Sequence, residues 1–163
     1  MKKTIIITLL IIVGLVILIW WGSLKQKPQV QNTGEESVLT TDSNLYDFGT
    51  ISMKDGDVAK EFIVTNPSDE DIFVSTVVTS CMCTKAFIVK PDGKTKGPFG
   101  MTGMGYVPPA NETIKAGEDR IIRVVYDPNA HGPAGVGFID RFVTLADSSG
   151  NSLELEIKAV VTP

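Results

Sequence analysis

The sequence is poor in the residues from which metal centres and acid–base sites are most often built. Its 163 residues include one histidine, His131, and two cysteines, Cys81 and Cys83. A structural zinc site takes four Cys or His ligands. The glycines around Met101 are not followed by the Gly-Lys-Ser/Thr of a phosphate loop, and no nucleophile elbow accompanies His131. We therefore expect that the protein is not an enzyme.

Basic residues are outnumbered by acidic ones. All 19 Asp and Glu residues follow residue 24, whereas 13 of the 15 Lys and Arg residues do, so this part of the chain carries a net charge of −6. A nucleic-acid-binding protein needs a basic face to neutralise phosphates. The composition thus predicts no nucleic-acid partner, and the acidic excess favours solubility.

One long hydrophobic run stands at the start of the chain. Residues 5–21 are apolar apart from one threonine, and about 17–20 such residues cross a bilayer core of about 30 Å. Lys2 and Lys3 precede the run, and two tryptophans close it, where indole rings favour the headgroup region. The sequence predicts a transmembrane signal anchor over residues 1–22, which contacts the membrane through residues 5–21.

A cleavable signal peptide is the alternative, because it also begins with basic residues and an apolar core. Its core is usually shorter, and Trp20-Trp21-Gly22 places bulky rings where a small-x-small cleavage site is expected. A short basic N-terminus before a long acidic domain is the usual signal-anchor arrangement. We expect a single-pass protein of the cell membrane, with its C-terminal domain outside the cytoplasm.

The rest of the chain divides into a linker and one domain. Residues 23–43 are rich in Gln, Ser, Thr, Asn and Glu and hold few large apolar residues, a composition typical of a flexible tether. Residues 44–163 are long enough for one domain with a proper core. We expect this domain to be all-β, an immunoglobulin-like antiparallel sandwich of about seven strands.

Short β-branched runs separated by turn sequences indicate that fold. The predicted strands are residues 45–51, 58–65, 72–79, 86–89, 120–126, 138–145 and 153–161. The last two flank a turn at residues 147–151 and predict a β-hairpin. The expected core residues are Phe48, Phe62, Val64, Val74, Ile122, Val124, Phe142 and Leu155.

Four segments resemble a bacterial protein family. They are Tyr46-Asp47-Phe48-Gly49-Thr50-Ile51, Phe62-Ile63-Val64-Thr65-Asn66, Ser80-Cys81-Met82-Cys83-Thr84 and Ile114-Lys115-Ala116-Gly117-Glu118. In their order and spacing, these segments are similar to the motifs of the bacterial domain of unknown function family 1573. The resemblance implies a Hydin-type immunoglobulin-like domain. Met82 stands where the family usually has a glycine between the two cysteines. The segment over residues 85–113 is also much longer than the short link that joins the cysteines to a Pro-Gly-Glu-like turn in the family. Because the family's biochemical role is not established, the resemblance implies a fold and a location rather than an activity.

Cys81 and Cys83 are the only candidate reactive pair. In an extended strand, residues i and i+2 have Cα atoms about 6.5–7 Å apart, near the limit for a disulfide, although a bend would shorten that distance. An exported location permits a disulfide. The two thiolates, together with the thioethers of Met101 and Met104, would alternatively suit copper(I), and thiol redox chemistry is a further possibility. We expect a structural role without a cofactor, with both cysteines packed as small apolar groups beside the core.

The long loop over residues 85–112 is the best candidate contact surface. Its apolar side chains Phe99, Met101, Met104 and Tyr106 lie among glycines and prolines, and long structured loops on sandwiches frequently bind partners. His131 falls in a turn between strands and is expected to be exposed. The sequence predicts a membrane-tethered module that binds a protein or a cell-envelope component without catalysis. The alternative is a copper-handling or thiol-redox accessory protein that uses Cys81 and Cys83.

Overall fold

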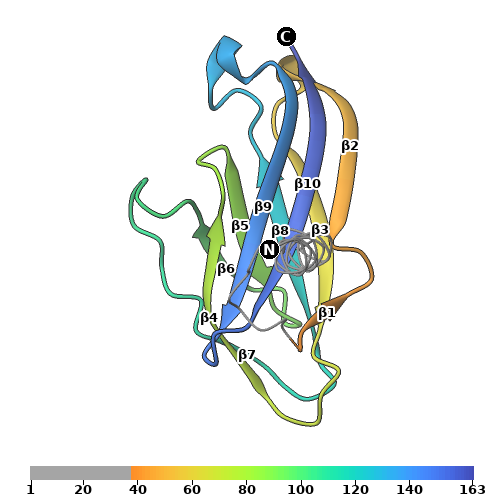
Figure 1. Ribbon diagram of the computed structural model, residues 1–163, viewed down its shortest axis with the longest axis vertical. Helices are drawn as coiled ribbons and strands as arrows, with labels where there is room; N and C mark the ends of the chain where they lie inside the picture. The colour runs from red at the N-terminus through yellow and green to blue at the C-terminus, as the bar shows by residue number, and fades with distance from the viewer. Residues whose placement is uncertain (1–37) are drawn as a thin grey trace, which may run out of the picture. The chain divides into compact units, whose positions relative to one another are not determined.

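The computed structural model describes residues 38–163, which form a β-sandwich of two five-stranded sheets (Figure 1). One sheet has the strand order β1-β3-β8-β5-β6 and the other the order β2-β10-β9-β4-β7. The strands are β1 Thr40–Thr41, β2 Leu45–Ser52, β3 Val58–Thr65, β4 Ile72–Thr79, β5 Thr84–Val89, β6 Thr95–Phe99, β7 Glu112–Ile114, β8 Asp119–Tyr126, β9 Gly137–Asp147 and β10 Ser152–Thr162. The predicted all-β sandwich is confirmed.

All seven predicted strands form, and the described residues add three short ones. These are β1, β6 and β7, of two, five and three residues. Each lies at an edge of its sheet, where a strand needs only one partner and can include residues that weaken a ladder. β6 carries a glycine and a proline. Such segments lack the β-branched runs from which the other strands were predicted.

The strand order is that of an immunoglobulin-like domain. In one sheet the neighbours β3, β8 and β5 correspond to strands B, E and D of that fold. In the other sheet the neighbours β10, β9 and β4 correspond to strands G, F and C. The sandwich is not purely antiparallel, because β2 runs parallel to β10. The sequence could not reveal this pairing, since 99 residues lie between the two strands and the side-chain periodicity of a strand is the same in parallel and antiparallel pairs.

Most of the predicted core is correct. Phe62, Val64, Val74, Ile122, Val124 and Leu155 are buried. Phe48 is partly buried and packs against the core. Phe142 does not face the core, because the buried residues of β9 are Ile139, Val143 and Leu145, which lie on the opposite face. Phe142 instead lies opposite Glu156 on the outer face of the sheet. The run that forms β9 has large apolar residues on both faces, so alternation alone did not distinguish them.

The sandwich extends further toward the N-terminus than residue 44. Leu39 is buried in the core, and Thr40 and Thr41 pair with Thr65 and Val64 of β3. The last residues of the predicted linker over residues 23–43 are therefore part of the folded domain.

The predicted anchor over residues 1–22 lies outside the described residues, as does the linker up to residue 37. Within residues 38–163, no helix has the length and apolar character needed to cross a bilayer.

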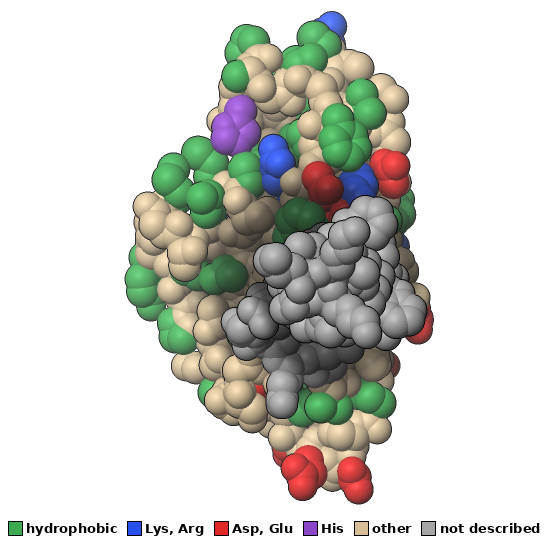
Figure 2. All heavy atoms as spheres, in the orientation of Figure 1, with side chains coloured by type: hydrophobic (Ala, Val, Ile, Leu, Met, Phe, Trp, Pro, Cys, Tyr) green, Lys and Arg blue, Asp and Glu red, His purple; other side chains and the backbone are tan. Residues whose placement is uncertain are grey.

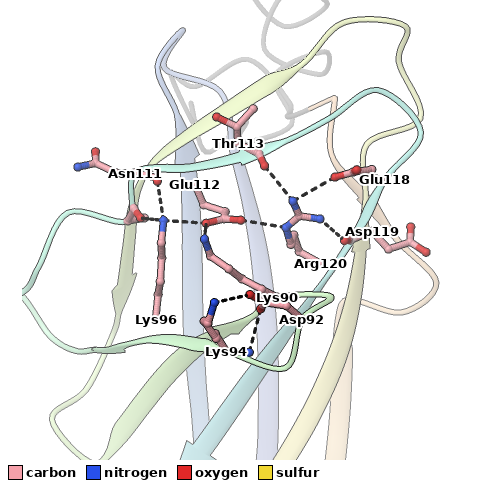
Figure 3. A network of polar contacts seen from close by, with 11 residues as sticks. Lys90, Asp92, Lys94, Lys96, Asn111, Glu112, Thr113, Glu118, Asp119 and Arg120 are labelled. Carbon is pink, nitrogen blue, oxygen red and sulfur yellow. Dashed lines mark hydrogen bonds and ion pairs between the residues drawn. The ribbon is translucent and has the colours of Figure 1, made fainter.

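A buried charge network joins the edge strands of the two sheets (Figure 3). The carboxylate of Glu112 on β7 lies 3.0 Å from Nε of Arg120 on β8 and 2.7 Å from Nζ of Lys96 on β6. Lys90 approaches the same carboxylate at 3.4 Å. Burial opposes ionisation of Glu112, but hydrogen bonds from Lys96 and Arg120 and the charges of Lys96 and Lys90 outweigh it, so the pKa of this carboxyl is lowered. The network ties β6 to β7 and thereby holds both ends of the loop between them.

Candidate functional site

Cys81 and Cys83 form a disulfide in the turn between β4 and β5. The chain bends at these residues, and the backbone N–H of Thr84 donates to the carbonyl oxygen of Cys81 at 3.1 Å. The bend brings the two Cα atoms to 5.3 Å, within the usual range for a disulfide. Cys83 is buried at 2% exposure, as expected of a small apolar group, whereas Cys81 is only partly buried.

Each sulfur has a nitrogen neighbour from a distant part of the chain. Nε2 of His131 lies 3.2 Å from Sγ of Cys81, and Nε of Arg141 donates to Sγ of Cys83 at 3.3 Å. His131 lies in the exposed loop between β8 and β9, and Arg141 projects from β9. The backbone N–H of Cys83 also points to Sγ of Cys81, at 3.4 Å.

The loop that carries His131 is fastened to the cysteine turn by backbone bonds. The N–H of Asp127 donates to the carbonyl oxygen of Cys83 at 2.9 Å, and the carboxylate of Asp127 accepts from the N–H of Asn129 at 2.7 Å. The side-chain amide of Asn129 donates to the carbonyl oxygen of Met53 at 2.8 Å. These bonds fix the course of the chain into His131, so its ring is held beside Cys81.

His131 was predicted to be exposed, and it is, but its partnership with Cys81 was not predicted. Arg141 was missed altogether. The two residues lie 50 and 58 positions from their cysteines in sequence, and only sheet packing brings them together. One signal was available for Arg141: it is a charged residue at an inward position of β9, between Ile139 and Val143. A charged group at an inward position, where it is partly withdrawn from water, needs a partner.

Cys81, Cys83 and His131 could hold a metal ion only after reduction of the disulfide. Their ligand atoms all lie within 4.8 Å of one another. Two thiolates and an imidazole are soft to borderline donors that suit copper(I) or zinc. In the disulfide, neither sulfur is a thiolate. Met82 and Met104 line the same surface hollow as Cys83, so a thioether lies on that side of the cysteine turn.

An exposed apolar surface adjoins the cysteine turn. We define the methionine surface as Met82, Met101, Met104 and Tyr106, whose exposed fractions are 45%, 36%, 58% and 86%. All four line one open hollow. Figure 2 shows hydrophobic side chains gathered on the side of the molecule where the loop between β6 and β7 lies. Three of the four predicted binding residues are therefore exposed together, and Met82 joins them from another loop.

Phe99 is the exception among the predicted binding residues. It is the last residue of β6 and is 1% exposed, so it anchors the loop and cannot present its ring to a partner. Ala110, at the other end of the loop, is equally buried, and its N–H donates to the carbonyl oxygen of Ser75 at 2.9 Å. The N–H of Thr79 donates to the carbonyl oxygen of Gly100 at 3.1 Å. The loop is thus fixed at both ends.

A second hollow, lined by residues 68–73 and part of 147–151, is polar. Two of its carboxylates accept hydrogen bonds from the backbone: Asp71 from the N–H of Ala116 at 3.0 Å, and Asp147 from the N–H groups of Ser149 and Asn151 at 2.8 and 2.9 Å. These bonds shape turns, so the methionine surface with the adjoining cysteine turn is the stronger candidate site.

Comparison with known proteins supports the family resemblance over part of the chain. The model of a family described as protein of unknown function, DUF1573, matches residues 39–96. The match includes both cysteines and ends within β6, before His131 and Arg141. No curated protein matches the sequence significantly.

Two solved structures share the fold. A protein of unknown function from Porphyromonas gingivalis W83 is 14% identical, with a TM-score of 0.54, over 82% of this chain and 51% of that protein. A family 123 glycoside hydrolase from Clostridium perfringens is 8% identical, with a TM-score of 0.52, over 73% of this chain and 23% of the hydrolase. The chain thus spans about half of the first protein and about a quarter of the second. At these identities the similarity concerns the fold alone.

Proposed function

We propose that the protein is a non-catalytic binding module of the bacterial cell envelope. Residues 5–21 tether it to the membrane, and the immunoglobulin-like domain binds a protein or envelope component outside the cytoplasm. The observation that supports binding is the methionine surface, where three methionines and a tyrosine are exposed around one hollow. Exposed apolar groups gathered in one place mark interaction sites on soluble domains.

The chemistry of this surface suits a partner that offers apolar side chains. Methionine is unbranched and polarizable, so it adapts its shape to the surface that covers it. Tyr106 adds a rigid ring with a polar tip, the kind of side chain enriched at protein interfaces. Because the loop is anchored by Phe99 and Ala110, binding orders fewer backbone groups than it would in a free loop.

Site-specific photo-crosslinking tests the proposal. A photoreactive amino acid at Tyr106 of the full-length chain in native membranes should give a discrete adduct, and Met104→Glu should suppress it by placing a charge in the contact. The matched control is the same amino acid at Ile63, which is 49% exposed on β3, three strands away from β6 in the same sheet. The absence of an adduct at position 106, or the same adduct from both positions, would refute the methionine surface as the binding site.

The membrane tether is tested on the native protein. The chain should stay in the membrane fraction after carbonate extraction, and mass spectrometry should find residues 1–21 intact at its N-terminus. A mature N-terminus between residues 22 and 28 would establish cleavage instead.

Copper handling is a second candidate, which the convergence of Cys81, Cys83 and His131 favours. The reduced full-length chain should then bind about one copper(I) ion, and exchange of both cysteines for serine should abolish binding while the domain stays folded. Copper content that is unchanged by this double substitution would exclude these ligands.

A further inference from the structure

We propose that the Cys81–Cys83 disulfide is a redox-active centre that exchanges with an external dithiol. In this exchange Cys81 is the sulfur attacked, and Cys83 leaves as a thiolate held by Arg141. The external dithiol is a pair of cysteines in a partner protein or a small-molecule dithiol. This activity is separate from the docking of a partner on the methionine surface and does not depend on it.

The first support is the difference in burial between the two cysteines. Cys83 is 2% exposed, whereas Cys81 is only partly buried. An attacking thiolate needs access to the sulfur with which it bonds. The pair therefore has one residue that is partly open to solvent, Cys81, and one that is shielded, Cys83.

The second support is that each sulfur already has a nitrogen in place that can donate a hydrogen bond, which His131 does when Nε2 carries its proton. Arg141 donates from Nε to Sγ of Cys83 at 3.3 Å, and its NH1 group is fixed by the carbonyl oxygen of Asp140 at 2.7 Å. Nε2 of His131 lies 3.2 Å from Sγ of Cys81. A disulfide sulfur is a weak acceptor and a thiolate a strong one, so both contacts strengthen when the disulfide is reduced. Donors that are placed in advance where charge develops lower the barrier to forming it.

The third support is that the disulfide encloses a very short loop. In the chain-entropy account, a loop of three residues stabilises a fold by only about half as much as a loop of 15 residues. The turn is also held without it, through the bond from the Thr84 N–H to the Cys81 carbonyl oxygen and the bond from the Asp127 N–H to the Cys83 carbonyl oxygen. Stabilisation of the fold is therefore a weak reason for this disulfide.

The exchange balances in two steps. In the first, one thiolate of the external dithiol bonds to Sγ of Cys81, the Cys81–Cys83 bond breaks, and the electron pair leaves on Cys83 beside Arg141. In the second, the other external thiolate attacks its partner sulfur in the mixed disulfide, and Cys81 leaves as a thiolate beside His131. The dithiol loses two electrons and two protons and becomes a disulfide, while the protein becomes a dithiol.

Kinetics on the full-length chain in detergent test the first step, with dithiothreitol as the probe. Arg141→Met should slow reduction of the disulfide about tenfold or more, because a hydrogen bond to a charged group is lost. Arg123→Met is the matched control: Arg123 is surface-exposed and paired with Glu61, and its loss should leave the rate unchanged. Equal reduction rates in the wild type and Arg141→Met, both folded by circular dichroism, would overturn the proposal.

Alkylation of the reduced chain tests the role of His131, which is exposed and therefore replaceable without loss of the fold. In the wild type, iodoacetamide should modify Cys81 before Cys83, because Cys83 is 2% exposed and Cys81 is only partly buried. His131→Gln should slow the modification of Cys81 at a fixed pH, because the ring nitrogen 3.2 Å from its sulfur is lost. The other charged groups around the cysteine turn are Asp57, Lys85, Asp127 and Arg141, and all are unchanged in this variant. Equal rates of Cys81 modification in both proteins, or preferential modification of Cys83, would overturn the proposal.

Discussion

Removal of the negative charge of Glu112 should destabilise the domain by about 3 kcal/mol. The side chain is 5% exposed and lies between Arg120, which is 8% exposed, and Lys96. Breaking a buried ion pair from one side costs about 3–5 kcal/mol, because the other charge stays buried without its partner. Arg120 retains the carboxylate of Glu118 at 3.1 Å and the carbonyl oxygens of Thr113 and Asp119. We therefore expect the lower end of that range for Glu112→Gln.

The measurement is urea unfolding of the full-length chain in detergent, followed by far-UV circular dichroism. The matched control is Glu61→Gln, which removes the partner of Arg123 in a pair whose side chains are 48% and 42% exposed. Surface pairs contribute about 0–1 kcal/mol, so the control should shift the midpoint little. A loss below about 1 kcal/mol in Glu112→Gln, similar to that in the control, would refute the assignment of Glu112 as the centre of a buried network.

The pH dependence provides an independent check of the same network. The pKa of Glu112 is lowered in the folded domain, so this group contributes stability fully above its unfolded pKa of about 4.3. That contribution is lost as the pH falls through the folded pKa, which lies below this value. The difference in stability between the wild type and Glu112→Gln should be constant near neutral pH and shrink below about pH 4.3. A difference that grows on acidification would contradict the direction of the shift.

Three further substitutions, two of them with a matched control, test the packing. Phe62→Ala should lower the free energy of unfolding by about 3–5 kcal/mol in the same assay, because the residue is 3% exposed. Phe138→Ala, at a position that is 67% exposed, should lower it by less than about 1 kcal/mol. Similar losses in the two variants would mean that the inward and outward faces of these strands are wrongly assigned. Leu39→Ala should cost about 2 kcal/mol or more, since Leu39 is 2% exposed; a neutral result would move the domain boundary back toward residue 44. Gly97→Ala should lower stability by about 2 kcal/mol or more, because φ is +123° and a Cβ would lie 2.8 Å from the carbonyl oxygen of Ala86. Gly100→Ala, where a Cβ meets open space, should be near neutral, and an equal loss at both glycines would contradict this account.

The arrangement of the candidate site was only partly accessible from the sequence. Met101, Met104 and Tyr106 were identified because a long Gly-rich loop with large apolar residues is unusual in a sandwich. Phe99 belongs to the same stretch, yet it is buried at the end of β6. Whether a loop residue anchors the loop or faces solvent depends on where the edge strand stops, and β6 has no β-branched run that would show this.

The disulfide shows a similar limit. Spacing alone made a bridge between Cys81 and Cys83 unfavourable in an extended chain, and its formation depends on a bend that brings the Cα atoms to 5.3 Å. The bend follows from the passage of the chain from β4 in one sheet to β5 in the other. Without the assignment of the two strands to different sheets, the turn between them could not be foreseen.

The sequence by itself determined the all-β class, the seven main strands, the β9–β10 hairpin and most of the core, because alternation with period two is a local property of each strand. Only the tertiary structure decided the parallel pairing of β2 with β10, the outward face of Phe142, and the meeting of His131 and Arg141 with the cysteines. These features depend on which strands become neighbours and in which register. The neighbours and the register of the strands depend on packing between segments that are 50 or more residues apart in the sequence, so a local sequence pattern cannot predict them.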